Sequence, residues 1–294
     1  MRHASLLLAL AAFGLSSCDG THNGATTAAT TAAVTVAGKK IDVTLILTEK
    51  ERRHAIPRLA PPTETQGHLL AWPRERLMKL EGERSGVSFD VAFLDKSGSI
   101  VDLRPLAGND AEGVMPKAAA AYALLLMPGQ PSKLGLKVGD KVELSAEIQN
   151  ARPEELPVMK IAGVTAWVEL ALTEEERQHG LMFRPRMSPD DGMLFAYPGE
   201  GNHSFWMMNT LIPLDIAFFA EDGTLVNVNE TPTWPDPRNQ ATSTSNSSSK
   251  GPARYVLEMN LGWFRKKGIV DGAGRFAPGT KAEIPTWASK GSVD

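Results

Sequence analysis

The chain repeats itself, and this internal repeat constrains its fold more than any other feature of its 294 residues. The dipeptide Ala-Gly at residues 37–38 recurs at residues 162–163, and the segment DVAF at residues 90–93 recurs as DIAF at residues 215–218. The two spacings agree, because 163 − 38 and 215 − 90 both equal 125. A spacing kept over so much of a chain indicates a duplicated structural unit. We therefore expect two copies of one domain in tandem, and the chain is long enough for both.

The second copy carries an insertion. For Tyr122 and its counterpart Tyr255 the offset of the repeat is larger, because 255 − 122 = 133. The increase from 125 to 133 means that the second copy has gained sequence before this point. The run NQATSTSNSSSKG at residues 239–251 has no large apolar side chain, as is typical of a loop. We expect the insertion in or near this run, in a mobile loop that borders the candidate site.

Each copy is predicted to open with a β-hairpin and a short helix. The segment KIAGVTAWVELAL at residues 160–172 shows the alternation of a half-buried strand. Thr173 and Glu176 form a capping box, which marks a helix start, and the first copy keeps it as Thr48 and Glu51. Short strands with Gly and Pro turns follow. The predicted fold is mainly β: two tandem β-sandwich domains of jelly-roll type, each with a short helix after the first hairpin.

The segment from Met1 to Cys18 has the layout of a secretory signal. Arg2 and His3 precede the apolar run LLLALAAFGL, and the segment LSSC that follows resembles a bacterial lipobox, whose cysteine is lipidated. Cys18 is the only cysteine, so it cannot form an internal disulfide. We expect an exported lipoprotein, anchored in a membrane through Cys18 and facing the periplasm or the cell exterior. The alternative is a plain signal peptide in which the cysteine occurs by chance.

Composition along the chain predicts the domain boundaries. Residues 20–33 contain almost no large apolar side chain, so burial cannot offset the entropy of ordering them. A short charged segment between the copies is bracketed by Pro153 and Pro157, which is typical of a linker. The predicted parts are a signal peptide (1–18), a disordered tether (19–33), a degenerate copy of the β domain (34–147), a linker (148–158), the second β domain (159–285) and a tail (286–294).

Aromatic, thioether, amide and carboxylate side chains crowd at residues 204–216 (SFWMMNTLIPLDI), which we interpret as the candidate site. An extended segment there would carry bulk on both faces, which indicates burial on both sides. The first copy has lost much of the polar set, since Arg184 is replaced by Leu59 and Glu258 by Leu125. Groups needed only for folding would persist in both copies, so the loss favours a ligand-binding role, and sequence drift in a supporting domain is the alternative. The residues predicted to bind a small ligand or an envelope component are Arg184, Phe205, Trp206, Asn209, Thr210, Asp215 and Glu258.

Other interpretations of these residues stay open. The cluster at residues 204–216 can be a plain core, since most aromatic and methionine clusters are interior. Asp215 and Glu258 can instead form the carboxylate pair of a hydrolase that acts on envelope glycans. The domain can also serve only structure or protein binding. Persistence in the degenerate copy suggests folding roles for Asp215 (Asp90 in the first copy), Arg177 (Arg52) and His179 (His54).

Charge and motifs narrow the function classes. A balance of 31 basic against 34 acidic residues gives a net charge of −3 and no basic field for nucleic acid. The chain lacks the usual signatures of serine hydrolases, zinc peptidases and phosphate-binding loops. Methionines at 182–208, with His203 near them, suit Cu(I) as ligands, but no M-x-x-M run is present and methionine also fills cores. We therefore expect no enzyme, no cofactor, no metal and no nucleic-acid partner.

The second copy resembles a known family. The segments LTEEERQHGLMFRPRMSPDDGMLFAYP, SFWMMNTLIPLDIAFFAEDGTLV and GPARYVLEMNLGW are similar to the domain of unknown function 192, and the resemblance spans residues 159–285. The first copy resembles the same family more weakly, through the repeat. This resemblance implies a mainly β fold of sandwich or jelly-roll type and an exported or membrane-linked bacterial protein. It implies no activity, because none is established for the family.

Overall fold

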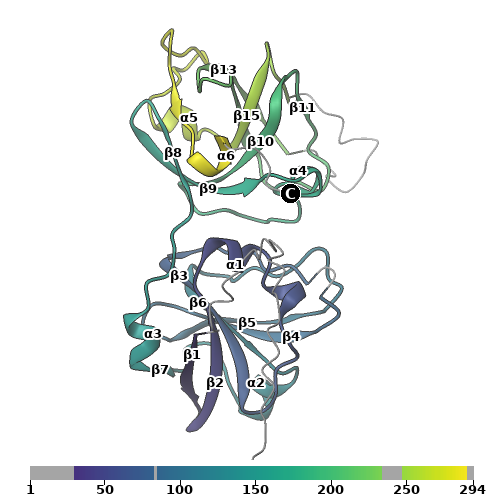
Figure 1. Ribbon diagram of the computed structural model, residues 1–294, viewed down its shortest axis with the longest axis vertical. Helices are drawn as coiled ribbons and strands as arrows, with labels where there is room; N and C mark the ends of the chain where they lie inside the picture. Colours follow the sequence, from purple (N-terminus) through teal and green to yellow (C-terminus); the bar gives the residue numbers. More distant parts are fainter. Residues whose placement is uncertain (1–29, 83–84, 234–246, 290–294) are drawn as a thin grey trace, which may run out of the picture.

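The computed structural model describes residues 30–82, 85–233 and 247–289, which form two β domains arranged along the long axis of the molecule (Figure 1). The predicted signal segment with Cys18, most of the predicted tether and residues 239–246 of the predicted loop lie outside the described residues. No helix in the described part of the chain is long and apolar enough to cross a membrane.

The first domain is built on one seven-stranded sheet with the order β5-β4-β6-β3-β2-β1-β7. Neighbouring strands are antiparallel, except that β2 and β3 run parallel. Its elements are β1 (Thr31–Val36), β2 (Lys39–Ile46), α1 (Glu49–Arg53), a 3-10 turn (Ile56–Arg58), β3 (Gln66–Arg76), β4 (Phe89–Leu94), β5 (Ile100–Leu106), β6 (Ala120–Leu126), α2 (Gln130–Lys133), β7 (Val142–Leu144) and α3 (Ala146–Asn150).

The second domain repeats this plan with the order β13-β12-β15-β10-β9-β8-β16, and β9 and β10 are again its parallel pair. Its elements are β8 (Val158–Ile161), β9 (Val164–Ala171), α4 (Glu174–His179), β10 (Asp191–Gly201), β12 (Leu214–Phe219), β13 (Leu225–Thr231), β15 (Ala253–Asn260), α5 (Trp263–Lys266), β16 (Ala282–Glu283) and α6 (Thr286–Ser289). A separate two-stranded sheet joins β11 (Ser204–Phe205) and β14 (Ser247–Ser248).

Local sequence explains how each domain begins. The turn at Ala162-Gly163 has φ values of 48° and 81°, and the first copy has 47° and 75° at residues 37–38. Positive φ at both central residues is the geometry of the two-residue hairpin turn that matches strand twist. The capping boxes at Thr173 and Thr48 are both formed, with hydrogen bonds in both directions. The repeated turn and cap therefore place the same hairpin and helix in both domains.

In each domain the sheet curls into a half-barrel with apolar clusters on both faces. The prediction of two tandem, mainly β domains with a short helix after each first hairpin is confirmed. The two layers of the predicted sandwich come from one continuous curled sheet.

The segment between the domains packs against the first domain. Arg52 donates to the carbonyl oxygen of Glu154 at 2.5 Å, and the backbone N–H of Glu49 donates to the Glu154 carboxylate at 2.9 Å. The predicted linker also overlaps ordered elements at both ends, because α3 extends to Asn150 and β8 begins at Val158. Likewise β1 begins at Thr31, inside the predicted tether. Pairing with β2 and β7 supplies the hydrogen bonds that composition alone did not reveal.

Candidate functional site

The stretch at residues 204–216 is not one extended segment. It consists of the two-residue strand β11, a turn, and β12 from Leu214 onward. Phe205 packs edge-on against Phe195 and Phe218 in the core, at centroid distances of 5.0 and 5.9 Å. Trp206 is 45% exposed. The expectation of burial on both sides is therefore wrong for Trp206, because the turn directs its side chain outward where a strand would have covered it.

Asp215 has a structural position. Its buried carboxylate accepts the N–H groups of Gly262 and Phe264 at 2.9 and 3.1 Å, at the start of α5. Asp90 accepts the N–H of Gly129 at 2.7 Å at the start of α2 in the first domain. The predicted folding role of the persistent aspartate is confirmed. This carboxylate is already bonded, which leaves it little capacity for a ligand.

Asp215 and Glu258 do not form a carboxylate pair. Glu258 lies opposite Ile216 in the β12–β15 register, and Asp215 lies opposite Met259. Successive side chains of a strand point to opposite faces, so the two carboxyl groups lie on opposite faces of the sheet. Asp215 and Glu258 therefore lack the arrangement that a two-carboxylate hydrolase needs. The alternative of a glycan hydrolase that uses this pair is not supported.

Arg52 and Arg177 also bear out the reasoning from the repeat. Arg177 donates to the carbonyl oxygens of Leu172 and Ala196 at 2.5 and 3.0 Å. Arg52 makes the equivalent pair of bonds, at 2.5 and 2.9 Å. Each arginine ties the end of the first hairpin to the next strand, which is a folding role in both copies.

Asn209 and Thr210 shape a turn beside Arg184. Asn209 has φ of 55°, a left-handed backbone that asparagine tolerates, and its carbonyl oxygen accepts the N–H of Phe183 at 2.8 Å. Phe183 also has positive φ, at 59°. Thr210 is buried, and its hydroxyl donates to the carbonyl oxygen of Met208 at 3.4 Å. Asn209 thus holds the loop that carries Arg184, and Thr210 closes its own turn.

The guanidinium group of Arg184 is already bonded to a carboxylate of the protein itself. Its two terminal nitrogens donate to the two oxygens of Glu169 at 3.0 and 2.5 Å. Arg76 of the first domain donates to the same carboxylate at 2.7 Å. Burial disfavours the charge on Glu169, but the two guanidinium groups hold its pKa well below its usual range. Arg184 therefore belongs to an ionic cluster across the domain boundary, which its prediction as a ligand-binding residue did not foresee.

Glu258 is buried and lies close to this cluster. Met193 pairs with Glu169 on one side and with Glu258 on the other, so the three side chains share one face of the sheet. Within the described ranges, no donor is bonded to the Glu258 carboxyl. Burial raises its pKa to about 8, and the charge of Arg184 only partly opposes this. At neutral pH Glu258 is therefore largely protonated, an unusual state for a carboxyl group.

A second set of charges, centred on the buried Lys79, joins the domains next to this face. The Lys79 ammonium, whose side chain is 1% exposed, lies 3.0 Å from Glu81 and 3.2 Å from His179, and donates to the carbonyl oxygen of Met182 at 2.9 Å. Burial alone would raise the pKa of Glu81, but the hydrogen bond from His179 and the charge of Lys79 lower it to about 2. His179 thus bonds across the domain boundary, and its first-copy counterpart His54 lines the cavity at the same boundary.

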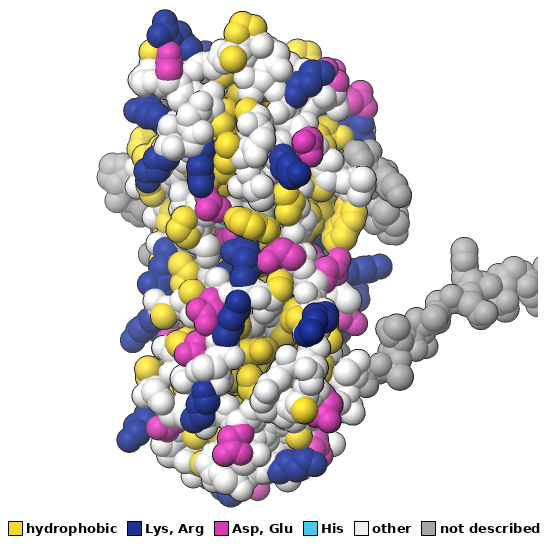
Figure 2. All heavy atoms as spheres, turned by 90° about the vertical axis from the view of Figure 1, so that its left-hand side faces the viewer, with side chains coloured by type: hydrophobic (Ala, Val, Ile, Leu, Met, Phe, Trp, Pro, Cys, Tyr) yellow, Lys and Arg dark blue, Asp and Glu magenta, His cyan; other side chains and the backbone are white. Residues whose placement is uncertain are grey.

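These groups line a cavity of about 430 Å³ between the two domains. Helices α1 and α4 border it, and Arg184, Met193, Lys79 and Glu169 form part of its wall. Phe205, Trp206, Asn209, Thr210, Asp215 and Glu258 do not line it. On the face shown in Figure 2, charged side chains of both signs are interspersed, without an extended patch of one sign.

Sequence reasoning missed Glu169, Lys79 and Glu81. Glu169 alternates with apolar neighbours in β9, which is the pattern of a solvent-facing position, but Arg184 of its own domain and Arg76 of the first domain cover it. The one available signal is that the first copy has Thr44 at this place, so the glutamate belongs to the second copy alone.

The described end of the predicted loop is ordered. Ser247 is fully buried and pairs with Phe205, and Ser248 pairs with Ser204. The isolated bridge between Leu80 and Val114 is the equivalent pairing in the first domain. The prediction of a mobile loop is therefore wrong for residues 247–251, because their backbone groups bond to β11 and to Asn227.

Comparisons with known proteins identify the fold family. The sequence matches DUF192, described as an uncharacterized ACR, over residues 32–144 and again over residues 158–274. A proposed transcription regulator from Sinorhizobium meliloti 1021 is 31% identical, over 45% of this chain and 97% of its own, with a TM-score of 0.36. A protein of unknown function from Novosphingobium aromaticivorans is 29% identical, over 48% of this chain and 98% of its own, with a TM-score of 0.36. No curated protein matches the chain. The chain belongs to the DUF192 family and contains two tandem copies of its domain.

Proposed function

We propose that this protein is a non-enzymatic binding module of the cell envelope that takes a small polar ligand into the cavity between its domains. The observation that carries the proposal is the set of buried and half-buried charged side chains from both domains along the wall of that cavity. Structural cores rarely bury Lys, Arg and Glu together, whereas binding sites place a few such groups to orient a ligand. The volume of the cavity between the domains, about 430 Å³, lies in the range of small-molecule sites.

The balance of charge on the wall indicates the ligand class. A ligand with a single strong charge would lie near a side chain of the same charge wherever it bound. A zwitterion can instead bond to side chains of both charges. We therefore propose an amino acid or a short peptide as the ligand. The cations and carboxylates of the wall are Arg53, Lys79 and Arg184, and Glu81, Glu169 and Glu176.

Thermal melting of the full chain with a panel of amino acids, dipeptides, tripeptides and neutral sugars tests this proposal. A ligand at a hundredfold excess over its Kd stabilises the folded state by about 2.7 kcal/mol, which raises the melting temperature measurably. Glu175, exposed on α4 at the rim of the cavity, is the position to block. Glu175→Trp should abolish the shift by filling the entrance.

Gln178→Trp is the matched control, because Gln178 is exposed on the same helix and does not line the cavity. It should leave the shift unchanged. If no compound of the panel moves the melting temperature of the native chain, the binding function is overturned and a structural role takes its place. A shift that survives Glu175→Trp would move the site away from this cavity.

We also propose that the protein is exported and anchored through a lipid on Cys18. The support is the signal-like segment and the cysteine at its end. Acyl chains on that cysteine would hold the mature protein on a membrane facing the periplasm or the exterior. Metabolic labelling with a fatty-acid analogue should mark the native protein and not Cys18→Ala, and only the native protein should sediment with membranes. An unlabelled, freely soluble native protein contradicts the anchor.

A further inference from the structure

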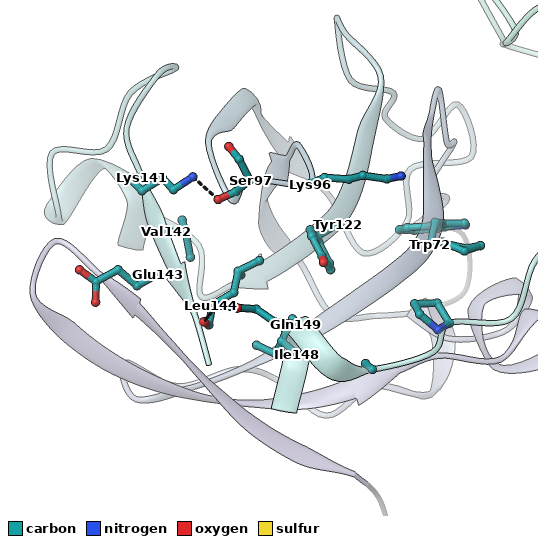
Figure 3. A pocket seen from close by; sticks show the side chains of 13 residues that line it. Trp72, Lys96, Ser97, Tyr122, Lys141, Val142, Glu143, Leu144, Ile148 and Gln149 are labelled. Atoms are coloured by element: carbon teal, nitrogen blue, oxygen red, sulfur yellow. Dashed lines mark hydrogen bonds between the residues drawn. The ribbon is translucent and has the colours of Figure 1, made fainter. Parts of the chain in front are cut away.

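A second cavity, of about 670 Å³, lies within the first domain (Figure 3). Trp72 and Tyr122 line it together with apolar side chains near α3. Lys96 and Lys141 lie along its rim, and in Figure 3 Lys96 extends above the aromatic rings. The one acidic residue that lines the cavity, Glu143, points away from Tyr122.

In the second domain a side chain fills the place equivalent to this cavity. Tyr197, Glu221 and Tyr255 are the equivalents of Trp72, Lys96 and Tyr122, by the offsets of the repeat before and after the insertion. The side chain of Arg254 contacts all three. It pairs with the Glu221 carboxylate, donates to the carbonyl oxygen of Tyr197 at 3.2 Å, and lies 5.5 Å from the ring centre of Tyr255.

The first domain has lost this filling side chain and reversed the charge beside it. Arg254 corresponds to Ala121, which cannot reach the equivalent groups. Tyr122 is half-buried, whereas Tyr255 is 1% exposed. Lys96 occupies the position of Glu221, whose carboxylate pairs with Arg254 in the second domain. An occupant of the open space would therefore meet an ammonium group where the second domain has a carboxylate.

Among the described residues, no nearby carboxylate forms an ion pair with the Lys96 ammonium. Lys141 donates to the carbonyl oxygen of Ser97, so it is already engaged. Glu75 accepts the backbone N–H of Lys96 at 2.9 Å, as Glu200 does for Glu221 in the second domain. In the described part of the chain, the Lys96 ammonium itself forms no ion pair.

We propose that the first domain binds a small organic acid with a flat apolar body in this cavity, its ring against Tyr122 and the apolar side chains near α3, and its carboxylate on Lys96. This site is separate from the cavity between the domains and does not depend on the function proposed there. Aromatic side chains supply the apolar surface, and the ammonium supplies a charge-assisted hydrogen bond. The degenerate copy is then a second binding domain.

Calorimetric titration of the full chain with 2-naphthoate tests the site, with 2-naphthalenemethanol as the uncharged analogue. We expect Lys96→Glu to raise the Kd for 2-naphthoate by about tenfold or more, the size of a lost charge-assisted hydrogen bond. The double variant A121R/K96E restores the side chains of the second domain and should abolish binding. The uncharged analogue should bind more weakly and respond little to Lys96→Glu.

Lys117→Glu makes the same charge change at an exposed position that does not line the cavity, and should change the Kd by less than about twofold. Melting curves of every variant show whether it is folded. If the double variant unfolds, Lys96→Gln, which keeps length and polarity, should still weaken binding by several-fold. No binding of 2-naphthoate by the native chain, or equal binding by the native chain and Lys96→Glu, overturns the proposal.

Discussion

Glu169→Ala is expected to lower the free energy of unfolding by about 3–5 kcal/mol, the usual cost of breaking a buried ion pair from one side. The carboxylate of Glu169 accepts from Arg184 and from Arg76, whose side chains are 6% and 3% exposed. Removing it leaves two buried guanidinium groups with less compensation, and one of them belongs to the other domain. The variant should therefore also weaken the contact between the domains.

Urea unfolding of the native chain and the variant measures this change. Thr44→Ala is the matched control, because Thr44 holds the equivalent position in the first copy and forms no such cluster. It should change stability by less than about 1 kcal/mol. A loss below about 1 kcal/mol for Glu169→Ala would show that water or rearranged side chains replace the carboxylate, and that the cluster does not join the domains.

Glu258→Gln is expected to remove a pH dependence of stability. The pKa of Glu258 in the folded protein is about 8, against 4.5 for an ordinary glutamate. Between these values the folded state keeps the proton that the unfolded state has released, so stability falls as the pH rises through this window. The pKa difference of about 3.5 corresponds to a cost of about 5 kcal/mol above pH 8, as an upper bound, and to none below about pH 4.5.

Glutamine keeps the shape of the side chain and cannot ionise. The variant and the native chain should therefore be similar in stability near pH 4.5, and the variant should be more stable by several kcal/mol near pH 8. Glu49, whose pKa burial raises to about 7, adds a similar slope to both proteins. The difference between the two unfolding curves isolates Glu258. Parallel stability profiles across this range would mean that the Glu258 carboxyl is solvated or bonded in solution.

The sequence by itself determined the features that depend on neighbouring residues or on the repeat. The Ala162-Gly163 turn and the capping box at Thr173 form from groups close together in the chain, so their signals are local. Comparison of the copies separated Arg177 and Asp215, which bond to the backbone in both domains, from residues found in one copy. The mainly β tandem architecture followed from these signals together.

Only the tertiary structure decided what the candidate site contains. A difference of one position in register puts Asp215 and Glu258 on opposite faces of the sheet, and no local pattern reveals register between distant strands. The alternation in β9 predicts that Glu169 faces water, but Arg76, 93 residues earlier, covers it. Burial against another domain depends on how two folded surfaces meet. The charged cavity between the domains therefore became visible only when both copies were seen in place.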